Sequence, residues 1–473
     1  MNNGERTTDN GERSFIPYAR QWIDEDDIRA VVEVLRSDWL TQGPRVREFE
    51  QAFAGYVGAK FAVAVNSGTA ALHLACLAVG LGPGDEVMTS PITFVATANC
   101  ALYVGARPAF VDIDPMTFNL DPRKLEAYLE QCSPFTVHRL PFKVGRWTID
   151  DGQQTTDNEF YPRAVIPVHF AGLPCDMPEI SRIAKRFDLI TIEDACHALG
   201  AEYPSGERVG SCVYSDMTVF SFHPVKHITT GEGGMVTTNN REFADRMRIF
   251  RNHGITRDPE KFVHRSPFTV HHTTTNNQQF STDNGQRITE NDFQQTTDNG
   301  QRITTPWYYE MLDLGFNYRM TDIQSALGMS QLKKIDIFVE KRREIANYYN
   351  QALKGLEDYI ILPTGDNEKH AWHLYVIQLK RGNRELLFRK LRENGIGVNV
   401  HYMPVYLQPY YQGLGYEKGI CPHAEKYFAR AITLPLYPAM KTSDMERVVE
   451  GVYRILRRCC GNVKGIAEYD IPQ

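Results

Sequence analysis

Residues 220–239 read FSFHPVKHITTGEGGMVTTN, and this stretch sets one lysine, Lys226, between an apolar run and a cluster of threonines and glycines. The apolar residues 217–222 are typical of a buried strand. The glycine-rich turn 231–234 allows backbone conformations that residues with a Cβ atom resist. A lysine held where water is scarce has a lowered pKa and becomes a nucleophile toward carbonyl carbon. If Lys226 is not an ordinary surface lysine, this is Schiff-base chemistry, with pyridoxal phosphate (PLP) as the candidate cofactor.

The whole-chain composition limits the possible classes of protein. The chain has 473 residues, 42% of them hydrophobic and 23% charged, which is ordinary for a globular enzyme with room for two domains. The net charge of −6 does not favour nucleic-acid binding. We also expect no membrane span and no secretory signal, because no apolar run is long enough. The nine cysteines form no Cys-x-x-Cys pair, which fits a reducing cytoplasm and no structural zinc.

Three segments differ in composition from the rest of the chain. They are residues 1–14, about 133–162 and about 265–305, and they share related strings such as TTDNGER and TTDNGQRIT. The strings do not recur at a constant period, so they do not indicate a solenoid. Their polar composition cannot offset the entropy of ordering, and long loops cost little extra closure entropy. We expect a low-complexity tail and two surface insertions. A partner-binding role for the Asn/Gln tracts is the alternative.

The remaining sequence alternates between two hydrophobic patterns. Strands are predicted at 61–65, 86–89, 108–112, 165–169, 189–193, 217–222 and 234–238, and helices at 25–36, 46–56, 69–81, 94–104 and 177–187. This alternation predicts an α/β fold with a mostly parallel central sheet. A long helix over 321–354 then leads into a smaller α+β segment. We therefore expect a large domain over residues 15–340 and a small C-terminal domain over 341–473.

Two polar motifs lie just past predicted strands, where ligands bind in such sheets. Ser67, Gly68 and Thr69 begin a predicted helix, so their N–H groups could cradle a phosphate, although a plain helix cap is equally open. Asp194 could pair with a protonated ring nitrogen, and His197 could lie beside the same ring. A helix cap and a satisfied polar residue are their structural alternatives. No second His/Cys cluster completes a metal site here.

Other candidates are less specific. Phe94 follows a strand and could stack on an aromatic cofactor, but a lone aromatic is more often core. Asn317 and Arg319 lie in a short loop and could reach an anion, or the loop could simply be solvated. His373 and His401 could line a substrate cleft in the small domain, with a structural role equally open.

The order of these motifs along the chain resembles the fold-type I PLP enzymes, specifically the DegT/DnrJ/EryC1/StrS family of nucleotide-sugar aminotransferases. The similarity runs from residue 15 to residue 458, apart from the two insertions. FIPYARQWIDEDDI (15–28), SPITFVATANC (90–100) and HYMPVYLQPYY (401–411) are similar to the pseudaminic-acid branch. The resemblance implies amination at C4 of a UDP-4-keto-6-deoxy-N-acetyl-L-hexosamine, with L-glutamate as amino donor.

The resemblance implies a role for each residue of the predicted PLP site. Lys226 would bind the cofactor covalently and then move the proton between cofactor and substrate carbons. Asp194 would pair with the pyridine nitrogen, His197 would lie near the 3-hydroxyl group and Phe94 would stack on the ring.

The resemblance also implies a phosphate site and a shared active site. Gly68, Thr69 and Ser221 would hold the phosphate of the same subunit. Asn317 would reach the phosphate of the neighbouring subunit, so a homodimer is expected. We expect the two insertions to protrude without blocking that dimer.

Arg319, His401 and Tyr402 are assigned to the substrate side of the site. The alternatives are an enzyme of the same family that acts on another 4-keto or 3-keto dTDP- or UDP-sugar, and a non-catalytic relative that binds the cofactor. A nicotinamide oxidoreductase does not fit, because no glycine-rich fingerprint follows the first strand.

Some relatives with histidine in place of the lysine are dehydratases, and here His227 follows Lys226 directly. The spacing decides between them. Ser221 to Lys226 and Lys226 to Gly231 are both five residues, which is the spacing of the lysine in the family. We therefore expect His227 to have little effect on the class of reaction.

Overall fold

The computed structural model describes residues 15–132, 160–262, 308–365 and 368–459. The predicted tail and nearly all of both predicted insertions lie outside these ranges. The chain divides into two compact units: a main unit, residues 1–248 and 318–473, and a second unit, residues 249–317. Among the described residues, no helix is long and apolar enough to cross a membrane.

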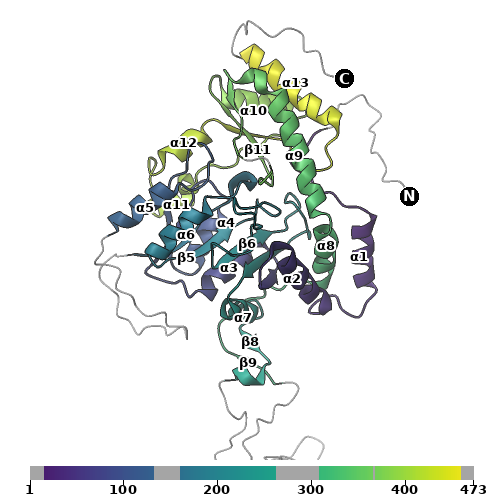
Figure 1. Ribbon diagram of the computed structural model, residues 1–473, viewed down its shortest axis with the longest axis vertical. Coiled ribbons are helices and arrows are strands. Elements are labelled where there is room, and N and C mark those ends of the chain that lie inside the picture. Colours follow the sequence, from purple (N-terminus) through teal and green to yellow (C-terminus); the bar gives the residue numbers. More distant parts are fainter. Residues whose placement is uncertain (1–14, 133–159, 263–307, 366–367, 460–473) are drawn as a thin grey trace, which may run out of the picture. The chain divides into compact units, whose positions relative to one another are not determined.

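A seven-stranded sheet forms the centre of the main unit (Figure 1). Its strands are β1 (Phe61–Val65), β2 (Asp85–Thr89), β3 (Arg107–Phe110), β4 (Tyr161–Ile166), β5 (Ile190–Asp194), β6 (Met217–Ser221) and β7 (Gly234–Thr238). Their order is β1-β7-β6-β5-β4-β2-β3, and only β7 runs antiparallel to its neighbours. The predicted α/β fold with a mostly parallel sheet is confirmed. The strands are buried almost throughout, as expected when helices cover both faces of a sheet.

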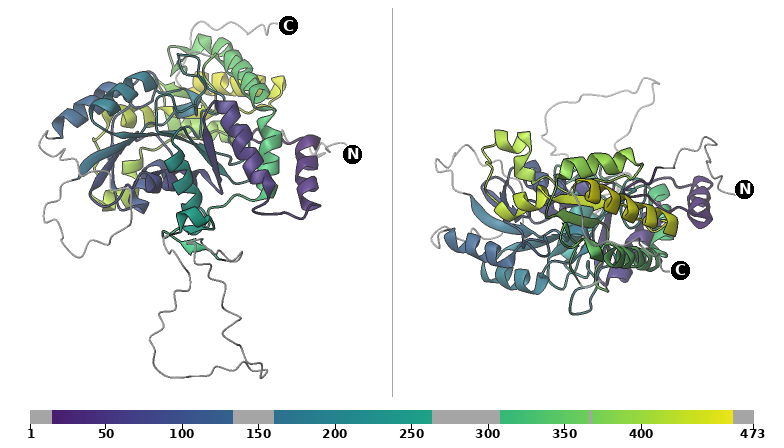
Figure 2. Two further views of the ribbon diagram at one scale, coloured as in Figure 1. Left: turned by 60° about the horizontal axis from the view of Figure 1, so that its bottom comes forward. Right: turned by 90° about the horizontal axis from the view of Figure 1, so that it is seen from above.

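Helices lie against both faces of this sheet (Figure 2). One face carries α3 (Gly68–Ala78) and α4 (Ala96–Tyr103), and the other carries α5 (Pro122–Gln131) and α6 (Met177–Arg186). The reason is the direction of the crossovers. The chain moves toward β3 through α3 and α4 but back toward β6 through α5 and α6, and right-handed crossovers then place the two pairs on opposite faces. All of α3 from Ala70 onward is buried, and every residue of this stretch except His73 is apolar.

Two further helices precede the sheet in the sequence. In α1 (Glu25–Leu35), Asp24 and Asp27 form a capping box at the N-terminus. In α2 (Pro44–Val57), proline starts the helix, and Gly58 ends it with a left-handed backbone, φ 82°. The ring of Phe53 in α2 packs against those of Phe49, Phe220 and Phe222, with centroids 5.0–6.0 Å apart.

The prediction of a single long helix over 321–354 is wrong. The structure has α8 (Asp322–Leu332) and α9 (Ile335–Ala352), separated at Lys333 and Lys334. Lys334 is the N-cap of α9, and its amino group lies 2.7 Å from Asp24 and 2.8 Å from Asp27. An ion pair with residues 300 positions earlier leaves no local pattern, so the break could not be read from the sequence.

The C-terminal segment has its own small sheet and core. The sheet is antiparallel and contains β10 (Ile360–Ile361), β11 (Tyr375–Leu379) and β12 (Ala431–Leu434). Around it lie α10 (Arg384–Glu393), α11 (Pro409–Gly413), α12 (Pro422–Phe428) and α13 (Thr442–Cys459). Ile16, near the N-terminus, packs in this core and pairs with Ile396. The predicted boundary at residues 340–341 stays a prediction.

The second unit begins within α7 (Arg241–Phe250). Its described residues include the short antiparallel pair β8 (Ile255–Thr256) and β9 (Glu310–Met311). Asn317 forms a backbone bridge with Asn252 inside this unit.

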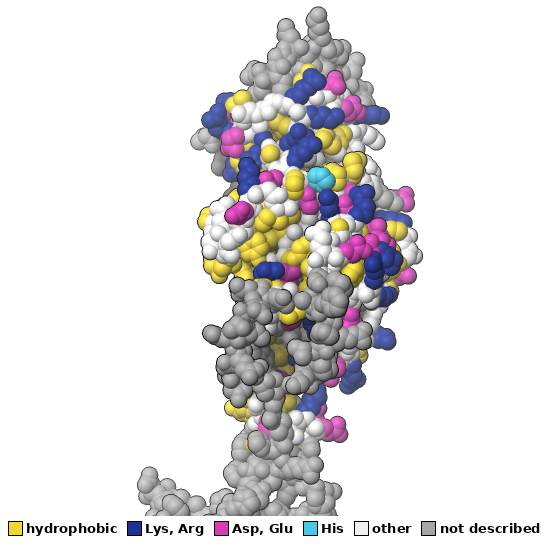
Figure 3. All heavy atoms as spheres, turned by 90° about the vertical axis from the view of Figure 1, so that its left-hand side faces the viewer, with side chains coloured by type: hydrophobic (Ala, Val, Ile, Leu, Met, Phe, Trp, Pro, Cys, Tyr) yellow, Lys and Arg dark blue, Asp and Glu magenta, His cyan; other side chains and the backbone are white. Residues whose placement is uncertain are grey.

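Charged side chains of both signs are interspersed over the face of the molecule in Figure 3, and hydrophobic side chains gather near its middle. This mixture is in keeping with the small net charge of −6.

Phe53→Ala tests the core between α2 and the sheet. Phe53 is fully buried, so truncation removes apolar contacts and leaves a cavity that costs about 3–5 kcal/mol of unfolding free energy. Urea unfolding followed by circular dichroism measures this loss. Ile337→Ala, which truncates an exposed side chain, should change the same quantity by less than about 0.5 kcal/mol. Equal effects of the two substitutions would contradict this description of the core.

Candidate active site

A cavity of about 670 Å³ opens at the ends of the central strands of the main unit. It brings together candidates that are far apart in the sequence. The predicted residues that line it are Gly68, Thr69, Phe94, Asp194, His197, Ser221, Lys226, His401 and Tyr402.

The first turn of α3 forms one side of the cavity, and the start of β7 packs against this turn. Ser67 caps α3, and its hydroxyl accepts the N–H of Ala70 at 3.1 Å. A Cβ atom on Gly68 would lie 2.9 Å from Cβ of Ser221, and one on Gly234 would lie 2.5 Å from the carbonyl oxygen of Ser67. Ser67, Gly68 and Thr69 line the cavity at the helix N-terminus, where backbone N–H groups and the helix dipole suit an anion.

The glycine turn has two different requirements. Gly231 has a left-handed backbone, φ 79°, with open space where a side chain would be. Gly233 and Gly234 are needed for close approach instead, since a Cβ atom on Gly233 would lie 2.2 Å from Oγ1 of Thr230. The backbone freedom inferred from the sequence is used at Gly231 alone within the turn.

Lys226 lies half-buried on the loop that joins β6 to β7. Its backbone N–H donates to the carbonyl of His223 at 2.9 Å. Burial lowers the pKa of the Lys226 amine, while the nearby Cys196 and Asp194 oppose that shift. Within the described part of the chain, its side chain has no hydrogen bond or ion pair. The amine is thus shielded and uncommitted, as a nucleophile requires.

Asp194 ends β5, and its carboxylate faces the cavity. The hydroxyl of Thr97 donates to Oδ2 at 2.6 Å, and the backbone N–H of Cys196 donates to Oδ1 at 3.1 Å. Asp194 is only 5% exposed. A buried carboxylate next to an open cavity is suited to pair with a cationic group of a ligand.

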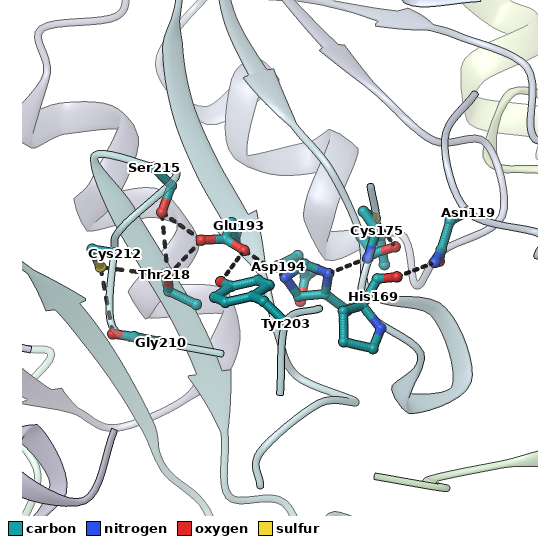
Figure 4. A network of polar contacts seen from close by, with 12 residues as sticks. Asn119, His169, Cys175, Glu193, Asp194, Tyr203, Gly210, Cys212, Ser215 and Thr218 are labelled. Carbon is teal, nitrogen blue, oxygen red and sulfur yellow. Dashed lines mark hydrogen bonds and ion pairs between the residues drawn. The ribbon is translucent and has the colours of Figure 1, made fainter. Parts of the chain in front are cut away.

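Glu193 faces the opposite side of the sheet, since successive strand residues alternate. Its oxygens accept from His169 Nε2 at 2.7 Å, Tyr203 at 2.6 Å, Ser215 and Thr218, as Figure 4 shows. Burial by itself raises the pKa of the Glu193 carboxyl, but the His169 hydrogen bond and the hydroxyl donors outweigh it and lower the pKa. Glu193 is therefore a satisfied buried acid. Among the described residues, no group of three His, Cys, Asp or Glu side chains could hold a metal ion.

His197 and Tyr402 meet across the cavity. The Tyr402 hydroxyl lies 3.2 Å from Nε2 of His197, and the two rings lie nearly parallel. Burial, together with the nearby Lys226, holds the pKa of His197 well below its usual value, so the ring is neutral. His373 lies behind His197, with ring centroids 4.4 Å apart, and does not line the cavity. The Nε2 atom of His227 bonds to the carbonyl of Ala371 at 3.0 Å.

His401 is held by its neighbours. Its Nδ1 lies 2.8 Å from the Thr433 hydroxyl, and its Nε2 lies 3.3 Å from the amide of Asn399. Burial and the nearby Lys226 lower the pKa of His401 to about 3, so this ring is also neutral.

Three candidates need separate comment. Phe94 is 58% exposed at the cavity, so it is not a core residue, and its ring face is available to a ligand. Arg319 belongs to the main unit but does not line the cavity. Asn317 belongs to the second unit, and its role stays a prediction.

Residues 21–453 match the DegT/DnrJ/EryC1/StrS aminotransferase family. The chain belongs to this family. It is 38% identical to the spore coat polysaccharide biosynthesis protein SpsC of Bacillus subtilis over 94% of this chain and 97% of that protein. It is 35% identical to the UDP-4-amino-4,6-dideoxy-N-acetyl-beta-L-altrosamine transaminase of Campylobacter jejuni, over 94% and 98%. A similar solved structure is Helicobacter pylori PseC, an aminotransferase involved in the biosynthesis of pseudoaminic acid, with TM-score 0.73, 28% identity and coverage of 94% and 100%.

Aminotransferases of this family depend on PLP, and the similar solved structures include one in its PLP form. The cavity fits this cofactor in three ways. A Cβ atom on Gly68 would collide with Ser221 at the anion cradle, Phe94 presents an uncovered aromatic ring, and Asp194 is a buried acid facing the cavity. The enzyme is therefore a PLP-dependent sugar aminotransferase.

Several lining residues escaped the sequence interpretation: Tyr18, Thr93, Thr97, Cys196 and Asn399. Thr93 directly precedes Phe94, and Thr97 follows Thr93 at the helical spacing of four residues. Cys196 lies between the predicted residues Asp194 and His197. A search around each motif would therefore have found all three. Tyr18 and Asn399 carry no local signal.

Gly68→Ala tests the anion cradle. The added methyl group would meet Ser221, so we expect PLP affinity to fall at least tenfold, measured by absorbance titration of the apoenzyme. The matched control is Gly55→Ala, because nothing lies within 4 Å of that position in α2. This control should keep PLP affinity and stabilise the fold by up to about 1 kcal/mol. Unchanged PLP affinity in Gly68→Ala would place the cradle elsewhere.

Because the pKa of His401 is lowered, we expect the stability of the fold to fall in acid. Its pKa is near 3 when folded and about 6.5 when unfolded, so the unfolded chain binds the extra proton between these values. Its contribution to stability is complete above pH 6.5 and is lost progressively as the pH falls toward 3. Between pH 7 and pH 5 the loss is about 2 kcal/mol. His401→Gln should reduce the fall in unfolding free energy by that amount in urea titrations at the two pH values. An identical fall in both proteins would show that His401 titrates normally.

Proposed function

We propose that this enzyme transfers the amino group of L-glutamate to C4 of a UDP-4-keto-6-deoxy-N-acetylhexosamine, in nucleotide-sugar biosynthesis of the pseudaminic acid type. The observation that carries the proposal is the shielded Lys226 amine beside Asp194, in one cavity with an anion cradle. We further propose that the enzyme is cytoplasmic and acts as a homodimer, with Asn317 reaching the phosphate site of the neighbouring subunit.

Each cavity residue has a role in this proposal. Gly68, Thr69 and Ser221 bind the cofactor phosphate at the start of α3, and Phe94 covers one face of the ring. PLP supplies an electron sink for the electron pair left when a proton is removed from a substrate carbon. Asp194 holds a proton on the pyridine nitrogen through a charge-assisted hydrogen bond.

Lys226 and His197 complete the reacting side. Because its pKa is lowered, the Lys226 amine is more often neutral near pH 7 than an ordinary lysine, so it can accept the proton from the substrate carbon and return it. The neutral His197 ring is anchored by the Tyr402 hydroxyl and can bond to the cofactor's 3-hydroxyl oxygen. His401 and Tyr402 act on the sugar-nucleotide side of the cavity. The substrate role of Arg319 stays a prediction, because Arg319 does not line this cavity.

The names of the relatives support this substrate class to different degrees. The name of the Campylobacter jejuni transaminase specifies a UDP-linked 4-amino-4,6-dideoxy sugar, and PseC is described as taking part in pseudoaminic acid biosynthesis. SpsC is somewhat more similar, and its name specifies a polysaccharide without a sugar. Other 4-keto or 3-keto UDP- or dTDP-sugars are therefore the alternative substrates. A non-catalytic relative is disfavoured, because Lys226 and Asp194 both face the cavity.

A substrate panel tests the proposal. The enzyme is offered L-glutamate with UDP- and dTDP-linked 4-keto and 3-keto sugars, and products are identified by mass spectrometry and NMR. We expect amination at C4 of the UDP-linked 4-keto-6-deoxy-N-acetylhexosamine. If only 3-keto or dTDP-linked sugars are aminated, the substrate assignment is wrong. If no acceptor is aminated, the proposed function is wrong.

Lys226→Ala supplies the mechanistic arm of that experiment. Loss of the proton-transferring amine should lower turnover at least about 10³-fold. The matched control is Lys185→Ala, which removes an exposed lysine of α6 that does not line the cavity. That variant should retain full turnover.

A further inference from the structure

Two buried threonines lead to the carboxylate of Asp194. The Thr97 hydroxyl lies 2.6 Å from Oδ2 of Asp194, and the Thr93 hydroxyl lies 2.7 Å from that of Thr97. Thr93 is 3% exposed and Thr97 is 1% exposed, although both border the cavity. A hydroxyl pair so well buried makes its hydrogen bonds within the protein.

The direction of these hydrogen bonds follows from the chemistry of the groups. An ionised carboxylate only accepts, so Thr97 must donate its one hydroxyl hydrogen to Oδ2. Thr93 must then donate to the oxygen of Thr97. The other carboxylate oxygen receives the backbone N–H of Cys196 at 3.1 Å. Both oxygens of Asp194 are thus fixed from the side of the protein.

We propose that Thr97, supported by Thr93, is a positioning residue for Asp194. Its hydrogen bond fixes the plane of the carboxylate and stabilises the negative charge there, so that Asp194 presents an ionised acceptor to the pyridine nitrogen of PLP. The inference rests on the proposed role of Asp194. Without the Thr97 donor, the shared proton moves from the ring toward Asp194, and the ring loses positive charge.

Other titratable groups also face Asp194. They are Lys226, Cys196, Tyr402 and the buried thiols of Cys100 and Cys175. Of these groups the Cys196 thiol also interacts with the Asp194 carboxylate as a hydrogen-bond donor, but a thiol is a weak donor, so the Thr97 hydroxyl at 2.6 Å is the stronger one.

Thr97→Val removes the donor and keeps the shape of the side chain. We expect PLP to bind about tenfold more weakly, equivalent to about 1.4 kcal/mol, the scale of one hydrogen bond to a charged group. We also expect the pH midpoint of the visible absorption change of the bound cofactor to rise. The reason is that a less positive ring repels a second proton less strongly. The nitrogen that joins the cofactor to Lys226 would then keep its proton up to a higher pH. Thr97→Ser should restore both values, and Thr93→Val should shift both in the same direction by less.

Two controls separate this role from a structural one. Thr89→Val removes another buried hydroxyl, whose bond goes to the carbonyl of Ile166 at 2.8 Å, and should leave the pH midpoint unchanged. Asp194→Asn tests the proposed role of Asp194 itself. If Asp194→Asn shifts the midpoint and Thr97→Val does not, the inference about Thr97 is overturned alone. If Asp194→Asn has no effect on either measurement, the assignment of Asp194 fails with it. Should Thr97→Val fail to fold, the sign of the Thr93→Val shift decides.

Discussion

The N-terminal turn of α3 lies so close to the β6–β7 pair that no side chain fits at Gly68 or Gly234. A Cβ atom on Gly234 would lie less than 3.0 Å from the carbonyl oxygen of Ser67, and one on Gly68 would lie less than 3.0 Å from Cβ of Ser221. Ser221 and Gly234 are also partners in the β6–β7 register. One backbone contact therefore sets the anion cradle and the two ends of the loop that carries Lys226. Hydrogen bonds from Phe222 to Gly233 and from Thr230 to Phe222 close that loop at its base.

The two neighbouring acids at the end of β5, Glu193 and Asp194, face opposite sides of the sheet and have different roles. Glu193 is turned away from the cavity and receives four side-chain donors, which matches the acceptor capacity of a carboxylate. Asp194 faces the cavity and receives two, which leaves acceptor capacity for a ligand. His197, His373 and His401 are neutral because burial lowers their pKa values. Among the described residues, the cavity lining thus contains two carboxylates, those of Asp194 and Glu232, and one lysine, Lys226.

The sequence predicts the central sheet well and the long-range polar contacts poorly. Strands buried on both faces are continuous apolar runs, so each of the seven was found within a few residues of its observed bounds. The motifs after those strands then converge because the carboxyl ends of parallel strands share one edge. The ion pair of Lys334 with Asp27 and the hydrogen bond of Thr97 to Asp194 join residues that are far apart in the chain. Neither contact produces a periodic pattern of hydrophobic residues in the sequence. The helices α5 and α7 were not predicted. Of these, α5 ends at Gln131, beside a segment set aside for its composition.

The lining of the cavity has two sources, and they are constrained differently. The cradle, Asp194 and Lys226 come from the ends of the large sheet, where close backbone packing permits little change. Tyr18, Asn399, His401 and Tyr402 come from the N-terminal segment and from the stretch that follows Ile396, which pair through Ile16 and Ile396. The backbone contact is also close there, since a Cβ atom on Gly397 would lie 2.7 Å from the carbonyl oxygen of Ile16, but side chains form the cavity wall itself. The two sources therefore assign the proposed cofactor contacts to the large sheet and the proposed sugar contacts to residues 399–402.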